Sequence, residues 1–275
     1  MAGVTYTRQD RIASIHIDAA ATGNAFTPEI RRQLNAALLE YRRDDEAWMG
    51  VISSAGPDFC VGTQEPAPTS TRERRERALL WGGGFVEIWK PTIAAVQGQC
   101  RGEGLALALS CDLRVADETS MFSADLSGDA SEPNVVAAWL INLVGISSAL
   151  ELLWLRRTLD AHEAQRIGLV NRLTVTGPKS GTTEDTSRFP MNPMPTTISV
   201  PDGSAGTAGM YLAEELLQYA PVTRVFQKEI ALRSVGAPFH YAQTLELGPN
   251  PYASEDRIEG TRAFVENRRP TWHNR

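Results

Sequence analysis

The sequence predicts a protein of the α/β class, and three observations support that prediction. Short runs rich in β-branched and apolar residues alternate with amphipathic stretches through the first half of the chain. A glycine-rich loop then joins a strand-like run to a stretch of small apolar residues that is typical of a buried helix. From residue 135 onward the pattern becomes mainly helical.

Composition limits the class of protein before any motif is considered. The chain has 275 residues, a net charge of −6 and a pI of about 5.4. This mild acidic balance argues against nucleic acid as the main partner. Cys60, Cys100 and Cys111 are odd in number and lack a Cys-x-x-Cys spacing, so we expect reduced core thiols in a cytoplasmic protein. We expect neither a signal peptide nor a membrane span.

The first part of the chain carries the signals of two strands and a capped helix. Isoleucines recur through 11–18, which indicates a strand, and a second strand is expected over 48–53. Between them, Thr27 suits the N-cap of a helix, with Pro28 at the first position and Glu29 near the positive end. The apolar stripe of this helix consists of Ile30, Leu34, Ala37, Leu38 and Tyr41.

The segment 90–116 contains the strongest candidate for a site. A strand-like run at 92–96 leads into glycines at 98, 102 and 104, and the apolar run 105–109 predicts a buried helix. Backbone N–H groups at a helix start carry partial positive charge, so this loop suits an oxyanion or another negative group. The alternative is that the glycines only allow close packing. A further strand is expected at 113–115.

Helical patterns dominate the second half. The expected helices cover 135–144, 147–157, 160–167, 210–219, 222–233, 238–247 and 254–268. Asp160 and Glu163 have the spacing of a capping box, and a short strand is expected at 169–173. Residues 176–209 are rich in Gly, Pro, Ser and Thr, which predicts a long surface insertion. The four histidines are scattered, so the sequence indicates neither a metal site nor a histidine-based triad.

Six motifs in order resemble the crotonase family, the enoyl-CoA hydratase/isomerase superfamily. They are Asn24-Ala25-Phe26, Phe59-Cys60-Val61-Gly62, KPTIAAVQG, LALALSCDLRVA, AHEAQRIGLVNRL and SEDRIEGTRAFVENRRP. The resemblance covers nearly the whole chain. It implies a crotonase (ClpP-like) spiral of ββα units over 1–208 and a helical C-terminal trimerisation region over 210–275. The implied assembly is a homo-oligomer, either a trimer or a dimer of trimers.

The resemblance also implies an acyl thioester substrate whose carbonyl oxygen lies between two backbone N–H groups, which stabilise an enolate. By position these groups belong to Thr63 and Glu103. Coenzyme A would enter as part of the substrate and no cofactor would be bound permanently. A carrier-protein thioester is the alternative. The residues expected to contact the thioester or coenzyme A are Ala25, Gly62, Gln64, Glu65, Pro66, Gly102, Phe264 and Arg268.

Departures from the family pattern change the expected chemistry. The two glutamates that activate water in hydratases of this family fall on Ala106 and Leu126, and neither residue can transfer a proton. Losing a general acid or base typically removes about 10²–10⁴ in rate, which disfavours ordinary hydration. Glu103 is expected either to face the pocket or to turn outward toward solvent or Arg101. The candidate proton carriers are Glu103, Asp125, Asp129 and Glu132.

Three classes of function stay open at this point. An enzyme would act through a stabilised enolate, by isomerisation, decarboxylation, C–C cleavage or an unusual hydration, and decarboxylation needs no added base. A non-catalytic acyl-CoA binder also fits the loss of both glutamates. A structural trimer would have a filled pocket. Coenzyme A contacts are weakened at Thr22, Gly23 and Asn267, where the family often has basic residues, although Arg268 and Arg269 follow.

Overall fold

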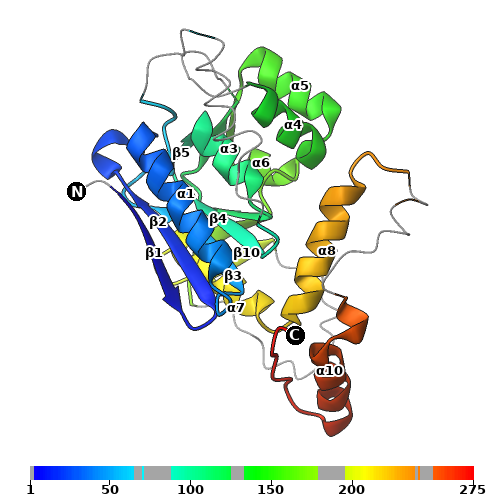
Figure 1. Ribbon diagram of the computed structural model, residues 1–275. Coiled ribbons are helices and arrows are strands. Elements are labelled where there is room, and N and C mark those ends of the chain that lie inside the picture. The colour runs from blue at the N-terminus through cyan, green and yellow to red at the C-terminus, as the bar shows by residue number, and fades with distance from the viewer. Residues whose placement is uncertain are drawn as a thin grey trace.

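A computed structural model describes residues 3–64, 70, 88–124, 133–178, 196–238, 241 and 250–275. The strands of its main sheet are β1 (Gly3–Gln9), β2 (Ile12–Asp18), β3 (Met49–Ser54), β4 (Thr92–Val96), β6 (Leu113–Ala116), β9 (Arg172–Thr176) and β10 (Thr197–Val200). They lie in the order β1-β2-β3-β4-β6-β9-β10 (Figure 1). β1 and β2 are antiparallel, and every other neighbouring pair is parallel. The predicted α/β class is confirmed.

A smaller sheet stands beside the main one. It contains β5 (Gln99–Arg101), β7 (Met121–Ser123) and β8 (Thr158–Asp160), in the order β5-β7-β8. The chain passes from β4 to β5 through Gly98, whose φ is +52°. A Cβ atom at Gly98 would lie 2.1 Å from the carbonyl oxygen of Pro57, so only glycine fits this turn. The glycine therefore sets the point at which the chain leaves one sheet for the other.

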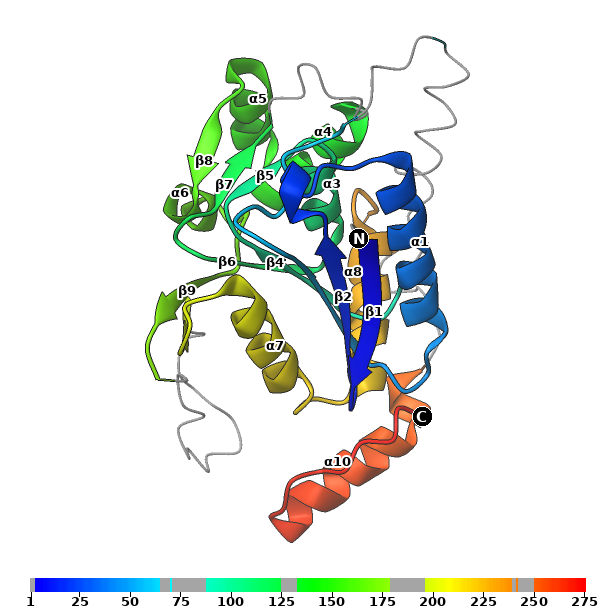
Figure 2. The same ribbon diagram turned by 90° about the vertical axis from the view of Figure 1, so that its left-hand side faces the viewer.

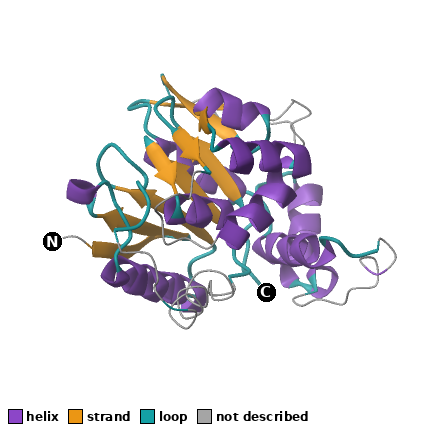
Figure 3. Cartoon of the chain, turned by 90° about the horizontal axis from the view of Figure 1, so that it is seen from above, coloured by secondary structure: helices purple, strands orange, loops and turns teal. Residues whose placement is uncertain are grey.

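Helices cover both faces of the main sheet (Figures 2 and 3). One face packs against α1 (Pro28–Arg43) and α3 (Glu103–Ser110), and the core on this side continues into α4 (Pro133–Val144), α5 (Ile146–Leu155) and α6 (Ala161–Arg166). The other face packs against α7 (Ala205–Leu216). On β3, Ile52 joins the first core and Val51 the second, because successive side chains of a strand point to opposite faces. The central strands are therefore buried on both sides.

The predicted helix starts at α1 and α6 are confirmed by their caps. The Thr27 hydroxyl accepts a hydrogen bond from the Ile30 N–H at 3.2 Å, with Pro28 at the first position. The Asp160 carboxylate accepts one from the Glu163 N–H at 2.7 Å. Each cap satisfies a backbone donor that has no partner within its helix.

The predicted surface insertion over 176–209 is wrong for its second part. Residues 197–200 form β10, which extends the sheet beside β9, and α7 begins at Ala205 rather than at 210. The small residues that suggested a loop allow α7 to lie close to the sheet. A Cβ atom at Gly209 would lie 3.1 Å from Val51 Cγ1 and 3.2 Å from Ala95 Cβ. The predicted boundary between 1–208 and 210–275 falls inside this helix.

The C-terminal part contains α8 (Pro221–Ser234) and α10 (Glu255–Glu266), which project from the sheet-containing body (Figure 1). The helices expected over 222–233 and 254–268 are confirmed to within a few residues. The helix expected over 238–247 lies largely outside the described residues. None of the helices in the described ranges has the length and apolar character that crossing a bilayer requires.

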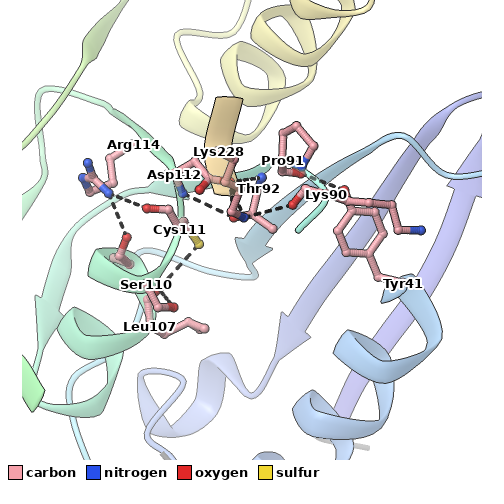
Figure 4. A network of polar contacts seen from close by, with 11 residues as sticks. Tyr41, Lys90, Pro91, Thr92, Leu107, Ser110, Cys111, Asp112, Arg114 and Lys228 are labelled. Carbon is pink, nitrogen blue, oxygen red and sulfur yellow. Dashed lines mark hydrogen bonds and ion pairs between the residues drawn. The ribbon is translucent and has the colours of Figure 1, made fainter. Parts of the chain in front are cut away.

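A polar network attaches α8 to the sheet (Figure 4). The Asp112 carboxylate, at the junction of α3 and β6, accepts hydrogen bonds from the Thr92 N–H at 2.7 Å and the Thr92 hydroxyl at 3.0 Å. The same oxygen accepts one from Lys228 Nζ at 2.8 Å, and Lys228 also donates to the Lys90 carbonyl at 3.1 Å. The Lys228 side chain is only 12% exposed, so this ion pair is better shielded than a surface pair.

We expect Lys228→Met to loosen α8 while the sheet stays folded. The substitution removes two hydrogen bonds from a charged donor, worth about 1–3 kcal/mol in total after the cost of desolvation. Amide hydrogen exchange should therefore be roughly tenfold faster or more along α8 and unchanged in β4. Gln227→Met, at an exposed neighbouring position, is the control and should have no effect. Unchanged exchange in Lys228→Met would show that α8 is held without the Lys228 contacts.

Candidate active site

Three segments far apart in the sequence lie side by side near the start of α3. Phe26 forms a parallel bridge with Thr63, through Phe26 N–H to the Gly62 carbonyl at 2.8 Å and Gln64 N–H to the Phe26 carbonyl at 2.9 Å. Cys60 forms a parallel bridge with Cys100, through hydrogen bonds of 2.9 and 3.1 Å. The segment 60–64 therefore runs between 24–26 and 99–103.

This pairing places two short sequences in matching positions. Cys60-Val61-Gly62-Thr63 and Cys100-Arg101-Gly102-Glu103 run in the same direction from paired cysteines. The glycine before each predicted oxyanion residue has a positive φ, +112° at Gly62 and +56° at Gly102. Both glycines therefore adopt a conformation that side chains disfavour, and both turn the chain at the same distance from the bridge.

The two loops are in direct contact. A Cβ atom at Gly104 would lie 2.4 Å from Cys60 Cβ and 2.8 Å from Cys60 Sγ. No real side chain tolerates such distances, so glycine at 104 is needed for the loops to approach. The proposal that the glycines only allow packing is thus correct for Gly104, whereas Gly62 and Gly102 set backbone direction.

The backbone donors of this loop pair have a favourable orientation. Gly62 C=O and Gln64 N–H both point to Phe26, so the Thr63 N–H between them points the opposite way, toward the side on which 99–103 lies. Glu103 is the first residue of α3, and Gly102, its N-cap, offers no side-chain cap. First-turn N–H groups of a helix have no partner within the helix and carry partial positive charge.

The Glu103 side chain does not follow either sequence expectation in full. It is buried, as a pocket-facing residue would be, but its carboxylate is held by Arg31 of α1 rather than by Arg101 or water. The Arg31 Nε atom lies 2.8 Å from Glu103 Oε2, with side-chain exposures of 4% and 3%. A carboxylate with a permanent counter-ion is poorly suited to carry a proton, and the predicted outward orientation is wrong.

Arg31 is a site residue that the sequence analysis missed. Its charge sets it apart from the predicted apolar stripe of the helix, yet it lies three residues before Leu34 and seven before Leu38, on the same face. An arginine on an apolar helix face predicts a buried acidic partner. Asn24, part of the Asn-Ala-Phe motif, has a structural role that the motif does not reveal. Its buried amide accepts from the Ala19 N–H and donates to two carbonyls, which holds the 19–26 loop against 55–58.

Of the two positions at which the resemblance places the hydratase glutamates, the structure describes 106 and not 126. Ala106 lies in α3, 4% exposed, so no proton-transferring group stands at that position. Ala25 is buried beside Phe26, and Gln64 is exposed at the end of its segment. The other predicted site residues of this region lie outside the described residues: Glu65, Pro66, Asp125, Leu126, Asp129 and Glu132.

The predicted C-terminal contacts lie on and after α10, in a separate part of the chain. Phe264 is 51% exposed. Arg268 is held by Glu259 through contacts of 2.5 and 3.0 Å and by Glu266 at 2.6 Å. The Arg268 guanidinium and the Thr271 N–H lower the pKa of Glu259 to about 2. Arg268 would have to exchange these partners before binding a phosphate, and its role in coenzyme A binding stays a prediction.

Comparison with known proteins agrees with this geometry. The family model for enoyl-CoA hydratase/isomerase matches residues 7–177. The probable mitochondrial enoyl-CoA hydratase 2 of Arabidopsis thaliana is 29% identical over 95% of this chain and 81% of its own. The (E)-benzylidenesuccinyl-CoA hydratase of Thauera aromatica is 26% identical over 98% of each chain.

Solved structures share the whole fold. The enoyl-CoA hydratase from Mycobacterium tuberculosis H37Rv superposes with a TM-score of 0.77 and 26% identity, covering 99% of both chains. The enoyl-CoA hydratase from Bacillus anthracis reaches a TM-score of 0.81 at 21% identity, again over 99% of both chains, which shows the likeness of fold. The predicted crotonase fold is therefore confirmed, and the chain belongs to the enoyl-CoA hydratase/isomerase family, within the crotonase superfamily.

Proposed function

We propose that this protein binds an acyl-CoA thioester and stabilises its enolate between the backbone N–H groups of Thr63 and Glu103. The observation that carries the proposal is the matched pair of loops. Two parallel segments each lead to a glycine with a positive φ, and Thr63 and Glu103 directly follow these glycines. Donors held in place before reaction stabilise developing negative charge without reorganisation. The thiol component of the thioester would be coenzyme A, which the names of the Arabidopsis and Thauera relatives contain.

The reaction we favour is a lyase or isomerase step that does not use the usual pair of glutamates. Ala106 has no proton to transfer. Loss of carbon dioxide from a carboxylated acyl thioester would generate the enolate without a base. Asp125 and Glu132 stay candidate acids or bases for the other reactions. A non-catalytic acyl-CoA binder is the second candidate, and the same absence of a carboxylate at Ala106 favours it.

We further propose that the chain works as a homo-oligomer through its C-terminal helices. α10 exposes Ile258, Phe264 and Val265 by 60%, 51% and 77%. Exposed apolar side chains on a projecting helix are typical of a surface that another chain covers. The cytoplasm stays the expected location, although the Arabidopsis relative is named as mitochondrial.

Calorimetric titration with acetoacetyl-CoA tests the thioester site, because its ionised form resembles the enolate. We expect a Kd in the micromolar range and a loss of about 10²-fold in Gly62→Ala, since a side chain at a φ of +112° shifts the Thr63 donor. Gly236→Ala is the matched control. It has a φ of +73° with no atom near the added Cβ, so it introduces similar backbone strain away from the site. Absence of binding by the unaltered protein would contradict the coenzyme A proposal and direct the search to carrier-protein thioesters.

Incubation with crotonyl-CoA tests the predicted loss of hydration. The initial rate should be at least about 10²-fold below that of a hydratase carrying both glutamates, because the acid/base at position 106 is absent. Loss of the conjugated enoyl absorbance measures the rate. Mass analysis of other acyl-CoAs, including carboxylated ones, separates the two candidates, since an enzyme changes the ligand and a binder returns it intact. Hydration at a typical rate would refute this prediction.

A further inference from the structure

The side chain of Glu103 creates an electrostatic problem for the proposed site. The same residue supplies an N–H to the predicted oxyanion hole and a carboxylate a few bonds away from that N–H. A negative side chain beside a developing oxyanion opposes its formation. In a partly buried site, one unit charge at about 5 Å changes an equilibrium by on the order of 10²-fold.

The structure places a cation against that carboxylate. Arg31 comes from α1, which begins two residues after Phe26, the residue bridged to Thr63. Five residues later in the chain, its Nε atom lies 2.8 Å from Glu103 Oε2. One helix is therefore joined at its start to the first loop, and through Arg31 to the second. Both side chains are at least 96% buried, so water screens neither charge.

We propose that Arg31 is a positioning residue that cancels the charge of Glu103 and thereby allows the Glu103 N–H to act as an oxyanion donor. This inference rests on the proposed function. It differs from a purely structural ion pair in one respect. A structural pair suffers from loss of either partner, because the remaining charge is buried alone. In a charge-cancelling pair the two substitutions have different effects. Loss of Arg31 weakens binding of the oxyanion, whereas loss of the Glu103 charge does not.

The test compares Arg31→Met with Glu103→Gln. Acetoacetyl-CoA reports on enolate binding and butyryl-CoA on binding of an uncharged thioester, both by calorimetry. We expect Arg31→Met to weaken acetoacetyl-CoA binding by on the order of 10²-fold and butyryl-CoA binding by less than about threefold. Glu103→Gln keeps the N–H and an oxygen that accepts from Arg31 but removes the negative charge, so acetoacetyl-CoA should bind more tightly than to the unaltered protein. The double variant should return to within about threefold of the unaltered protein.

The pH dependence of binding gives a second readout. In Arg31→Met, lowering the pH protonates Glu103 and removes its charge, so acetoacetyl-CoA affinity should recover relative to that of the double variant, in which only the ionisation of the ligand changes. The double variant should not show this recovery. The other titratable groups on the surrounding described elements include Glu29 and Arg32 of α1, Arg101 of β5 and the thiols of Cys60, Cys100 and Cys111. Arg32 lowers the pKa of Glu29 to about 2, and burial raises the pKa of Cys100 and raises that of Cys111 to about 12, so Glu29 stays charged and these two thiols stay neutral across the range.

The controls separate failure of this inference from failure of the proposed function. Arg32→Met removes an exposed arginine that pairs with Glu29 on the same helix, and both ligands should bind unchanged. If the unaltered protein binds neither ligand, the proposed function fails. If it binds both, equal losses in Arg31→Met and Glu103→Gln, or equal weakening of the two ligands, would overturn the charge-cancelling role. Should Arg31→Met fail to fold, the double variant and Arg31→Lys, which keeps the positive charge, still give the comparison.

Discussion

The parallel bridge between Cys60 and Cys100 is the contact on which the candidate site depends. It aligns two segments that are forty residues apart in the sequence and makes them end at the same place. Because both cysteines are fully buried, the bridge lies within the main core rather than at a mobile edge. The conformations of Gly62 and Gly102 have functional meaning only because this pairing brings their loops together. A site made from backbone donors needs such support, since no side chain can compensate for a displaced N–H group.

Two opposite charges are buried beside these loops. Glu103 places a carboxylate at the start of α3, Arg31 of α1 lies 2.8 Å from it, and Ala106 of the same helix has no acidic group. A buried ion pair is rarely a gain in stability over apolar packing, because both charges must leave water. Its presence at the start of α3 is therefore better explained by electrostatics at the site than by the stability of the fold.

The same dependence on distant contacts holds in the C-terminal half. Asp112 joins β4, the end of α3 and α8 through one carboxylate oxygen. At the far end, the buried carboxylate of Asp256 on α10 accepts hydrogen bonds from the N–H groups of His273 and Asn274. The terminal segment is thereby folded back along α10, and Trp272 Nε1 donates to the Gln218 carbonyl just after α7. Asp112 and Asp256 thus help to hold α8 and α10, two helices that bury few apolar side chains.

The sequence by itself determined the features that arise from local patterns and ordered motifs. These were the α/β class, the family, the caps of α1 and α6, and the glycine positions of the two loops. Helix propensity, capping and turn preferences depend on a few neighbouring residues, so they can be predicted from the sequence. β10 and the start of α7 differ from the prediction because small and polar residues favour a loop locally. β10 forms by pairing with β9, and the small residues of α7 allow that helix to pack closely on Val51 and Ala95. The Arg31–Glu103 pair was decided by tertiary structure alone, because its members are seventy-two residues apart and only the fold brings them together.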